Sequence, residues 1–290
     1  MKFLKKNFDF LILGSNGNLA KEIIKVLKSK KFTFFKIAKI NSDYNIDLNN
    51  HRKLEKIFKN HRFKYVINCA AITNFEYCEK NKLVSSKINY LLPKFLGIIS
   101  NHYNFKIIHI STDHVYFSKK NILNSEKSKI KAVNFYTNTK IKAEKAIKFS
   151  KKYLIIRTNF LGRSSYQKTS FVDWVYLSIM KKKKIKLFYD MFTSTIDIES
   201  CAKFILQLTC VNSRGIYNLG CKGQISKKDF AIKFAKKLGL TLNYEGVSSN
   251  ISKITRGNNL GMNVKKIEKK LNLNMPTINK VINNLVKYYK

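Results

Sequence analysis

Apolar and polar positions follow two alternating patterns along the first half of the chain. Short, nearly continuous apolar runs are typical of strands that are buried on both faces of a sheet. Between them lie segments whose apolar residues recur at helical spacing, which predicts amphipathic helices. The runs that predict strands are residues 8–13, 32–38, 65–70, 106–110 and 153–158. The segments that predict helices are residues 18–30, 51–61, 91–103 and 135–150.

Strands that alternate with helices in this order predict a parallel, doubly wound α/β sheet of the Rossmann type. The alternation weakens after about residue 160, which predicts a smaller C-terminal α/β lobe. We therefore expect a larger domain over residues 1–160 and a smaller lobe over 161–290, with the chain partly interleaved between the two. The short strands of the second half are 185–188 and 215–219, and its helices are 198–209, 226–238 and 277–288.

The composition predicts a folded chain with a sizeable core. Hydrophobic residues make up 44% and aromatic residues 13% of the 290 residues. No apolar run reaches the length of about 18–20 residues that a membrane helix needs, so we expect no membrane insertion. We interpret the first residues, MKFLKKNFDFLILG, as the start of a buried strand and not as a secretion signal, because Asp9 interrupts a short apolar run.

The five cysteines are odd in number and form no C-x-x-C pair. That usage is typical of buried thiols in a reducing cytoplasm, so we expect a cytoplasmic protein with no disulfides and no bound metal. Cys69 closes an apolar run, and by itself it is interpreted as a core residue.

Lysine dominates a formal net charge of +40. Arginine supplies only six of the 57 basic residues, whereas proteins that recognise bases and phosphates usually use its planar guanidinium. The lysines are spread from end to end, and the densest run, residues 181–186, is interpreted as a solvated helix end. We expect no specific nucleic-acid partner, although a diffuse positive field attracts an anionic ligand such as a nucleotide.

The sequence GSNGNLA follows the first predicted strand directly and opens the first predicted helix. Gly14 permits a tight turn, Gly17 lets the backbone approach a pyrophosphate, and Ala20 lets the helix pack closely on the strand. The free N–H groups at the helix N-terminus then face the anion. The spacing is G-x-x-G-x-x-A, so a purely structural glycine turn is the alternative. Its position after the first strand favours nucleotide binding.

The end of the second predicted strand bears on the choice of dinucleotide. An acidic residue there would bind the ribose 2′-hydroxyl and repel a 2′-phosphate. The segment KIAKIN has no acidic residue, and Lys36 and Lys39 would tolerate the phosphate. We therefore expect NADP as the preferred cofactor, with NAD as the alternative.

Tyr136 and Lys140 lie four residues apart, so they share one face of the predicted helix 135–150. By itself such a pair is usually a surface contact. Here it follows a nucleotide turn and comes 24 residues after Thr112, which ends an apolar strand. A phenol that acts as an acid near neutral pH needs a pKa below its usual value of about 10, and a nearby lysine ammonium lowers it. Thr112 is then the group that holds a carbonyl oxygen beside the phenol, so we expect a Thr112–Tyr136–Lys140 catalytic set.

These motifs and their order resemble the extended short-chain dehydrogenases, and within them the dTDP-4-dehydrorhamnose reductases, an RmlD-like sugar-nucleotide-binding family. The resemblance covers nearly the whole chain. It rests on ILGSNGNLA, DLNN, YVINCAAITNFEYCE, KINYLLP, ISTDHVYF, FYTNTKIKAE and LIIRTNFLG. The tail from RGIYNLG to RGNNLGMNVKKIEKKL resembles the substrate lobe of that family.

The resemblance implies an NAD(P)H-dependent reduction of a 4-keto sugar nucleotide. It points to dTDP-4-dehydro-L-rhamnose as substrate and to dTDP-L-rhamnose, a precursor of surface polysaccharide, as product, and it leaves a homodimer open. The cofactor-binding residues that it implies are Gly14, Asn16, Gly17, Asn18, Leu19, Asp47, Leu48, Cys69, Ala70, Ala71, Thr73, Asn89, Tyr136 and Lys140. The substrate-binding residues that it implies are Asp113, Val115, Asn159, Phe160 and Arg256.

Two other functions remain alternatives. A sugar-nucleotide dehydratase or epimerase shares the fold, but a dehydratase that resembled this chain would carry Thr-Asp-Glu at 112–114, and His114 stands in place of the glutamate. A non-catalytic NADP-binding regulatory subunit, such as that of methionine adenosyltransferase, also resembles these reductases. The intact Thr112, Tyr136 and Lys140 favour an enzyme over such a subunit.

Overall fold

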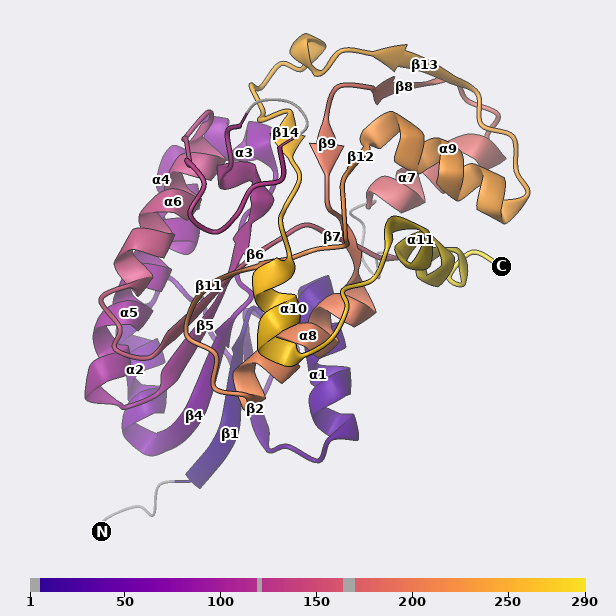
Figure 1. Ribbon diagram of the computed structural model, residues 1–290. Coiled ribbons are helices and arrows are strands. Elements are labelled where there is room, and N and C mark those ends of the chain that lie inside the picture. The colour runs from indigo at the N-terminus through magenta and orange to yellow at the C-terminus, as the bar shows by residue number, and fades with distance from the viewer. Residues whose placement is uncertain (1–5, 119–121, 164–169) are drawn as a thin grey trace. The chain divides into compact units, whose positions relative to one another are not determined.

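The computed structural model describes residues 6–118, 122–163 and 170–290 (Figure 1). The chain divides into two compact units. Within the described residues, no helix combines the length and the apolar character that a membrane crossing requires. Unit 1 comprises Met1–Ser111, Asn134–Ile156 and Ile205–Ile216, and unit 2 comprises Thr112–Val133, Arg157–Phe204 and Tyr217–Lys290.

A seven-stranded sheet, whose strands lie largely in unit 1, has the order β11-β6-β5-β4-β1-β2-β3. The neighbours from β5 to β3 all pair in parallel, which confirms the predicted parallel α/β sheet. The strand order reverses between β1 and β4, and in open α/β sheets ligands bind at the carboxyl ends of the strands at such a reversal. The strands are β1 (Lys6–Leu13), β2 (Phe34–Ala38), β3 (Tyr44–Asn45), β4 (His61–Asn68), β5 (Lys106–Thr112), β6 (Tyr153–Thr158) and β11 (Gly215–Leu219).

Helices of unit 1 cover both faces of this sheet. Figure 1 shows α2, α5 and α6 against one face and α1 against the other, which is the doubly wound arrangement that the alternating pattern predicts. The helices of this unit are α1 (Asn18–Ser29), α2 (His51–Asn60), α3 (Phe75–Lys80), α4 (Lys82–Ser86), the π-helix η1 (Lys87–Leu91), α5 (Leu92–His102) and α6 (Phe135–Ile147).

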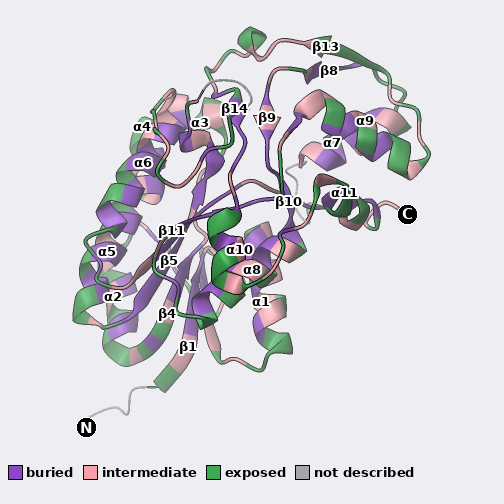
Figure 2. Cartoon of the chain, viewed as in Figure 1, coloured by how far each residue is buried: buried purple, intermediate pink, exposed green. Residues whose placement is uncertain are grey.

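The core of unit 1 explains why its strands are continuous apolar runs. The four residues Phe10–Leu13 at the end of β1 are all fully buried, so side chains on both faces of the strand are covered. Leu11 and Leu13 belong to a cluster with Phe58 of α2 and Leu96 of α5. In Figure 2 the strands of the sheet are mostly buried, whereas the outer faces of α2 and α5 carry exposed positions.

Unit 2 is built from helices and short strands, and its described strands form three small sheets. In the first, β10 pairs with β7; in the second, β9 lies between β12 and β14; in the third, β13 pairs with β8. The strands are β7 (Phe160–Leu161), β8 (Ile185–Phe188), β9 (Phe192–Thr193), β10 (Ile196–Asp197), β12 (Ile225–Ser226), β13 (Tyr244–Val247) and β14 (Asn259–Leu260). The helices are η2 (Asp113–Val115), α7 (Phe171–Met180), α8 (Ile198–Cys210, which ends in unit 1), α9 (Lys227–Leu238), η3 (Ser249–Ile251), α10 (Lys265–Leu271) and α11 (Ile278–Val286).

Residues 215–219, which were expected in the smaller lobe, form β11 at the edge of the seven-stranded sheet. The predicted elements otherwise agree with the structure apart from their ends. The largest difference is in β4, which begins at His61 although the apolar run suggests a start at Tyr65. Residues 61–64 alternate between covered and exposed positions, and this weaker period-two pattern extends the strand through pairing with β1. The lysine-rich run 181–186 begins where α7 ends, its first four residues are exposed, and its last two residues belong to β8.

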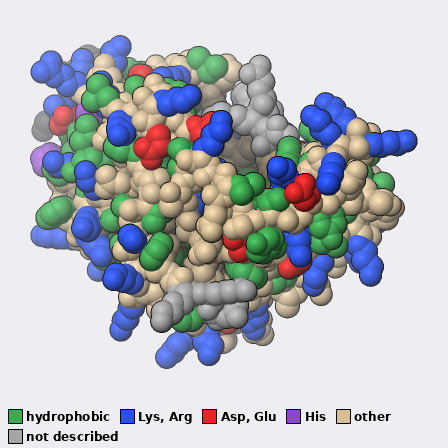
Figure 3. All heavy atoms as spheres, turned by 90° about the horizontal axis from the view of Figure 1, so that it is seen from above, with side chains coloured by type: hydrophobic (Ala, Val, Ile, Leu, Met, Phe, Trp, Pro, Cys, Tyr) green, Lys and Arg blue, Asp and Glu red, His purple; other side chains and the backbone are tan. Residues whose placement is uncertain are grey.

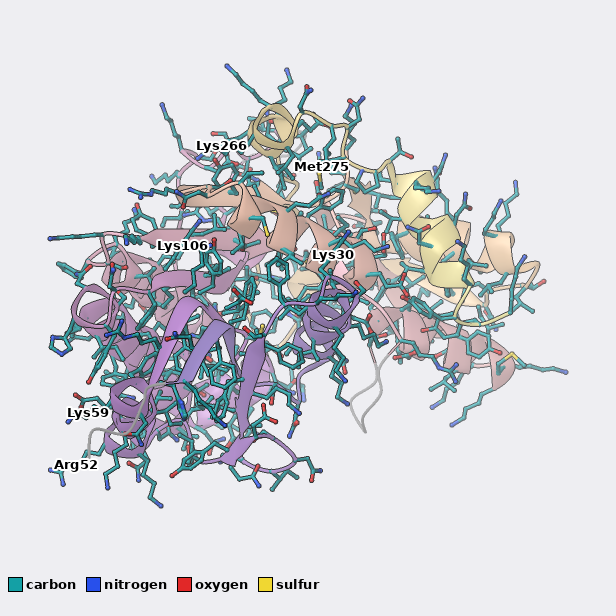
Figure 4. The ribbon with its side chains drawn as sticks, turned by 90° about the horizontal axis from the view of Figure 1, so that it is seen from below. Lys30, Arg52, Lys59, Lys106, Lys266 and Met275 are labelled. Carbon is teal, nitrogen blue, oxygen red and sulfur yellow. The ribbon has the colours of Figure 1, made fainter. Side chains whose placement is uncertain are left out.

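Basic side chains are scattered over the surface. Figure 3 shows Lys and Arg side chains spread across the visible face and interrupted by other side chains. Within unit 1, Figure 4 places Lys30 after α1, well away from Arg52 and Lys59 on α2. This distribution agrees with the interpretation of the net charge of +40 as a general property of the composition.

Candidate active site

The turn after β1 brings the end of that strand against the loop that follows β4. Gly14 has a φ of 74°, and a Cβ placed on it would lie 2.9 Å from the backbone of Ala70. A side chain at position 14 would therefore be strained in conformation and would collide with the neighbouring loop. At Gly17 a Cβ would lie 3.3 Å from the carbonyl oxygen of Gly14, and Ala20 is fully buried. The tight turn at Gly14 and the close packing at Ala20 agree with the G-x-x-G-x-x-A spacing, and the approach of a pyrophosphate to Gly17 stays a prediction.

The first turn of α1 fits an anionic group. Gly17 is the N-cap, and within the described part of the chain no side chain caps this helix. No acidic residue occurs in the first turn of α1, where the positive end of the helix dipole favours a negative charge. Leu19 packs into the core, while the Asn16 amide donates to the carbonyl oxygen of Ile40 over 2.8 Å and fixes the turn against the end of β2. The turn therefore suits the pyrophosphate of a dinucleotide.

Two lysines stand near the end of β2, as the sequence indicates, but each is paired with an aspartate. Lys36 Nζ lies 3.2 Å from Asp43, whose other carboxylate oxygen accepts the Lys36 backbone N–H. Lys39 Nζ lies 3.1 Å from Asp47 and is 71% exposed. Asp43 follows the predicted strand end by five residues, so inspection of the strand tip alone missed it. Both signs of charge are thus present where the ribose of a dinucleotide would lie.

Asp47 also lines a surface pocket. The backbone N–H of Asn49 donates to this carboxylate over 2.9 Å, and this bond together with Lys39 holds the pKa of Asp47 below its usual value. Leu48, by contrast, turns its side chain into the core, so any contact with a ligand would have to come from its backbone. The pocket has a volume of about 460 Å³ and is lined by Asp47, Asn49, Asn50, His51 and Arg52.

The loop after β4 is held by Asn89 of the π-helix η1. The Asn89 amide accepts from the backbone N–H of Ile72 over 2.8 Å and donates to the Ile72 carbonyl oxygen over 2.9 Å. Asn89 is itself buried, whereas Ala71 and Thr73 on either side of the clamp are exposed. Both ends of the Asn89 amide are therefore used to shape the loop. Its predicted part in cofactor binding stays a prediction.

Tyr136 and Lys140 lie one turn apart on α6, as predicted. Asn134 and Thr137 form a capping box that fixes the start of the helix. The backbone N–H of Phe135 donates to Glu79 of α3 over 2.6 Å, and the ring of Phe75 meets that of Tyr136 edge to face at a centroid distance of 5.0 Å. Tyr136 is thus held by both its own helix and α3.

Lys140 is almost fully buried in a polar environment. Its Nζ donates to the carbonyl oxygen of Ile110 over 2.7 Å and lies 3.3 Å from Nε2 of His109. Burial lowers its pKa to about 8, against the opposing effect of the Glu144 carboxylate. Burial also raises the pKa of the Cys69 thiol to about 12, so Cys69 is a neutral neighbour at the end of β4.

The two hydroxyls at the end of β5 have different surroundings. Ser111 donates to Glu144 of α6 over 2.6 Å, which makes it a structural residue of unit 1. Thr112 Oγ1 accepts the backbone N–H of His114 over 3.2 Å, which caps the short helix η2, and donates its own proton to Oδ1 of Asp113 over 3.3 Å. The capping role that a strand-end hydroxyl commonly has is therefore present at Thr112. A second, catalytic role for this hydroxyl stays a prediction.

The predicted substrate residues lie in unit 2, where a buried carboxylate organises several of them. Asn159 donates from Nδ2 to Asp113 over 2.8 Å, and its Oδ1 accepts from Thr195 at 3.3 Å. His114 lies beside Asp113, and burial lowers its pKa although the carboxylate opposes the shift. Arg256 contributes a positive charge near His114. Val115 is fully buried in η2, and Phe160 pairs with Ile196 in the sheet of β7 and β10. Both residues therefore help to hold the local structure of unit 2.

A sequence profile of the RmlD substrate binding domain family matches residues 8–290. The chain belongs to this family. It is 22% identical over 283 residues to the probable low-salt glycan biosynthesis reductase of Haloferax volcanii, which covers 92% of this chain and 93% of that protein. It is also 22% identical over 246 residues to dTDP-4-dehydrorhamnose reductase of Escherichia coli, which covers 81% of this chain and 80% of that protein.

Solved structures share the fold of this RmlD-family chain. The dTDP-4-dehydrorhamnose reductase of Bacillus anthracis, solved in complex with NADP, superimposes with a TM-score of 0.87 at 21% identity. That match covers 98% of this chain and 100% of the Bacillus anthracis chain. The dTDP-4-dehydrorhamnose reductase from Clostridium acetobutylicum gives a TM-score of 0.86 at 24% identity, with coverage of 97% and 98%. These likenesses confirm the Rossmann-type fold over nearly the whole RmlD-family chain.

The sequence of this RmlD-family chain did not indicate two residues, Lys227 and His109, whose surroundings shift their pKa values. Lys227 opens α9, its Nζ lies 4.9 Å from the centre of the Phe171 ring, and burial lowers its pKa to about 8 although Asp113 opposes the shift. His109 is fully buried in β5 beside Lys140. Neither has a motif that could reveal it, because lysine is abundant in this chain and a lone histidine in a strand is usually structural.

Proposed function

We propose that this protein reduces a 4-keto sugar nucleotide with NADPH, and that dTDP-4-dehydro-L-rhamnose is its substrate. Membership of the RmlD family supports a sugar-nucleotide reductase. The observation that carries the proposal is the pair of Tyr136 and a buried Lys140 on one face of α6. The uncapped glycine turn between β1 and α1 in the same unit supports a dinucleotide beside that pair. The sequence likeness to the dTDP-4-dehydrorhamnose reductase of Escherichia coli named above supports this choice of substrate.

The cofactor would be held by backbone and small residues of unit 1. Gly14, Gly17 and the first N–H groups of α1 would bind the pyrophosphate, and Asp47 would contact the adenosine part. Ala71 and Thr73 would face the cofactor from the loop that Asn89 shapes. When bound, NADPH supplies the hydride for reduction of the carbonyl carbon. NADP is preferred in this proposal because Lys36 and Lys39, although each is paired with an aspartate, place positive charge where the 2′-phosphate would lie.

Tyr136 would donate its phenolic proton to the carbonyl oxygen of the substrate as the carbonyl carbon is reduced. Its neighbour Lys140 would stabilise the phenolate that remains, because an ammonium one turn away favours the charged form of the tyrosine. Lys140 would also bind the ribose of the cofactor. Thr112 would donate its hydroxyl to the carbonyl oxygen, a role that the family resemblance suggests for the hydroxyl at the end of β5.

The sugar nucleotide would be bound by the polar residues of unit 2. Asp113 and Asn159 are already linked and would orient hydroxyl groups of the sugar. Lys227 and Arg256 both lie near Asp113 or His114, and their combined positive charge suits the diphosphate of the substrate. The lowered pKa of His114 means that this side chain is neutral at pH 7, so it is a poor replacement for the acidic residue of a dehydratase.

The proposal is tested by absorbance of the reduced nicotinamide. The purified protein is incubated with NADPH and a panel of 4-keto sugar nucleotides that differ in base and sugar. Loss of the nicotinamide band with dTDP-4-dehydro-L-rhamnose, together with formation of dTDP-L-rhamnose, is the expected result. Turnover only with another member of the panel would replace the substrate but keep the reductase. Binding of NADPH without turnover on any member would favour the non-catalytic subunit.

A further inference from the structure

A buried chain of three polar side chains runs from the end of β4 to α6 inside unit 1. Asn68 and His109 are register partners on the parallel strands β4 and β5. Nδ2 of Asn68 lies 3.3 Å from Nδ1 of His109, and Nε2 of His109 lies 3.3 Å from Nζ of Lys140. All three residues are buried, with exposed fractions of 1%, 0% and 1%. Both ring nitrogens of His109 are thus used inside the protein.

The orientation of the Asn68 amide is fixed by a backbone group. The N–H of Ala70 lies 3.1 Å from Oδ1 of Asn68. A backbone N–H can only donate, so the amide oxygen must face Ala70 and the amide nitrogen must face His109. The NH₂ group of an amide is a donor, and Nδ1 of His109 must therefore accept.

This orientation determines where the imidazole proton lies. A neutral imidazole that accepts at Nδ1 carries its proton on Nε2. The Nε2–H then points at Nζ of Lys140, which can accept a hydrogen bond only as a neutral amine. When Lys140 is an ammonium, its N–H group and the Nε2–H group of His109 are two donors that face each other. The arrangement therefore favours the neutral amine, in addition to the effect of burial.

Charged and titratable groups from three elements face Lys140. Glu144 and Tyr136 lie on its own helix α6, Cys69 follows β4, and His109 comes from β5. Burial lowers the pKa of Lys140 to about 8, and the negative charge of Glu144 opposes this shift. His109 itself has a pKa well below 6.5, because of burial and the charge on Lys140, so it stays neutral at the pH of the reaction.

We propose that His109 is a positioning residue that sets the charge of Lys140, through the hydrogen-bonded chain from Asn68 to His109 to Lys140. The inference rests on the proposed role of Lys140 in the reductase reaction. In the charged form Lys140 supports proton donation by Tyr136, and in the neutral form it does not. The hydrogen-bonded chain therefore sets the pH above which activity is lost, and brings that pH close to neutral. Asn68 connects this hydrogen-bonded chain to Ala70, in the loop that borders Gly14.

The first experiment measures the tautomer directly and needs neither cofactor nor substrate. Nitrogen-15 NMR of the full chain, with all five histidines labelled, reports which ring nitrogen carries the proton, and His109→Gln assigns the signal. We expect Nε2 to be protonated between pH 6 and 9, with a shift of its resonance centred near pH 8 as Lys140 loses its proton. That shift should vanish in Lys140→Met. A proton on Nδ1, or a signal that does not respond to Lys140, overturns the proposal.

The second experiment measures the pH profile of kcat. His109→Gln offers Lys140 an amide oxygen, and Asn68→Asp offers Nδ1 an acceptor, which moves the imidazole proton and frees Nε2 to accept. Both changes stabilise the ammonium, so the alkaline limb should move to higher pH by about one unit. The matched control is His102→Gln, at the exposed end of α5, which should leave the profile unchanged.

The outcomes separate this inference from the proposed function. Lower kcat in His109→Gln at every pH, with no movement of the alkaline limb, would show a merely structural histidine and contradict the inference. If Asn68→Asp does not fold, the His109→Gln profile and the tautomer still decide. A parent protein with the expected tautomer but no turnover on any keto sugar would count against the proposed function and leave the hydrogen-bonded chain established.

Discussion

Ser111 donates its hydroxyl to Glu144 over 2.6 Å, while the hydroxyl of the next residue, Thr112, accepts the backbone N–H of His114 and donates to Asp113. The two neighbouring hydroxyls at the end of β5 therefore belong to different parts of the structure. Ser111 links β5 to α6 inside unit 1, and Thr112 is the first residue of Thr112–Val133, the first segment of unit 2.

Substitution should separate these two hydroxyls. Ser111→Ala removes a hydrogen bond to a buried carboxylate, so the free energy of unfolding should fall by about 1–3 kcal/mol with little change in kcat. Thr112→Val should lower kcat far more than stability, and Thr112→Ser, which keeps the hydroxyl, should retain most of the activity. Denaturant unfolding and steady-state kinetics check both effects. Equal kcat for Thr112→Val and the parent would remove Thr112 from the catalytic set.

Gly14→Ala should impair cofactor binding through steric contact with the loop after β4. The new Cβ would lie 2.9 Å from the backbone of Ala70, so the loop or the turn must shift. The matched control is Gly215→Ala, where φ is 92° but no described atom lies within 4 Å of the added Cβ. Both variants should lose about 1 kcal/mol or more of stability from the positive φ. Calorimetric titration should show weaker NADPH binding for Gly14→Ala alone, and unchanged affinity there would argue against the phosphate turn.

NADPH should bind at least as tightly as NADH. Lys39 is 71% exposed and shares its charge with Asp47, so its contribution to the 2′-phosphate is that of a surface ion pair. We expect Lys39→Ala to weaken NADPH binding by about two- to fivefold and NADH binding less. Lys59→Ala on α2, where the lysine is 63% exposed, serves as control. A clear preference of the parent for NADH would show that another group recognises the ribose.

Tyr136→Phe should lower kcat by about 10²–10⁴-fold, the usual contribution of a positioned general acid. Cofactor affinity should change much less, because the ring and its edge-to-face contact with Phe75 remain. Tyr103→Phe removes another phenol of unit 1, one that is bonded to Glu55 at 3.2 Å, and should leave kcat unchanged. Normal turnover of Tyr136→Phe would mean that a different group protonates the product.

The sequence patterns predicted the sheet, the glycine turn and the Tyr136–Lys140 face well, because each depends on local spacing. The groups that surround Lys140 depend instead on the register between strands. Asn68 meets His109 only through the parallel pairing of β4 and β5, and a single sequence does not contain that register. Asp43 was missed for a related reason, because a chain reversal after β2 brings it back to Lys36.

Asn89 shows a further limit of pattern and resemblance. The family resemblance places Asn89 in a helix that follows the β4 loop and implies that it is a cofactor-binding residue. In the structure both amide groups are bonded to Ile72, so the residue shapes the loop from behind. Which partners a buried amide takes depends on the π-helical turn of η1, and no spacing rule predicts that turn.

The central claim is that hydride moves from the nicotinamide to the keto carbon of a sugar nucleotide. It is tested most directly with NADPH that carries deuterium at its hydride-donating carbon. The protein is incubated with this cofactor and dTDP-4-dehydro-L-rhamnose, and the product is analysed by mass spectrometry and NMR. We predict dTDP-L-rhamnose with one deuterium on the carbon of the former carbonyl group. Product without deuterium at that carbon, or no product while the cofactor remains bound, would contradict the account.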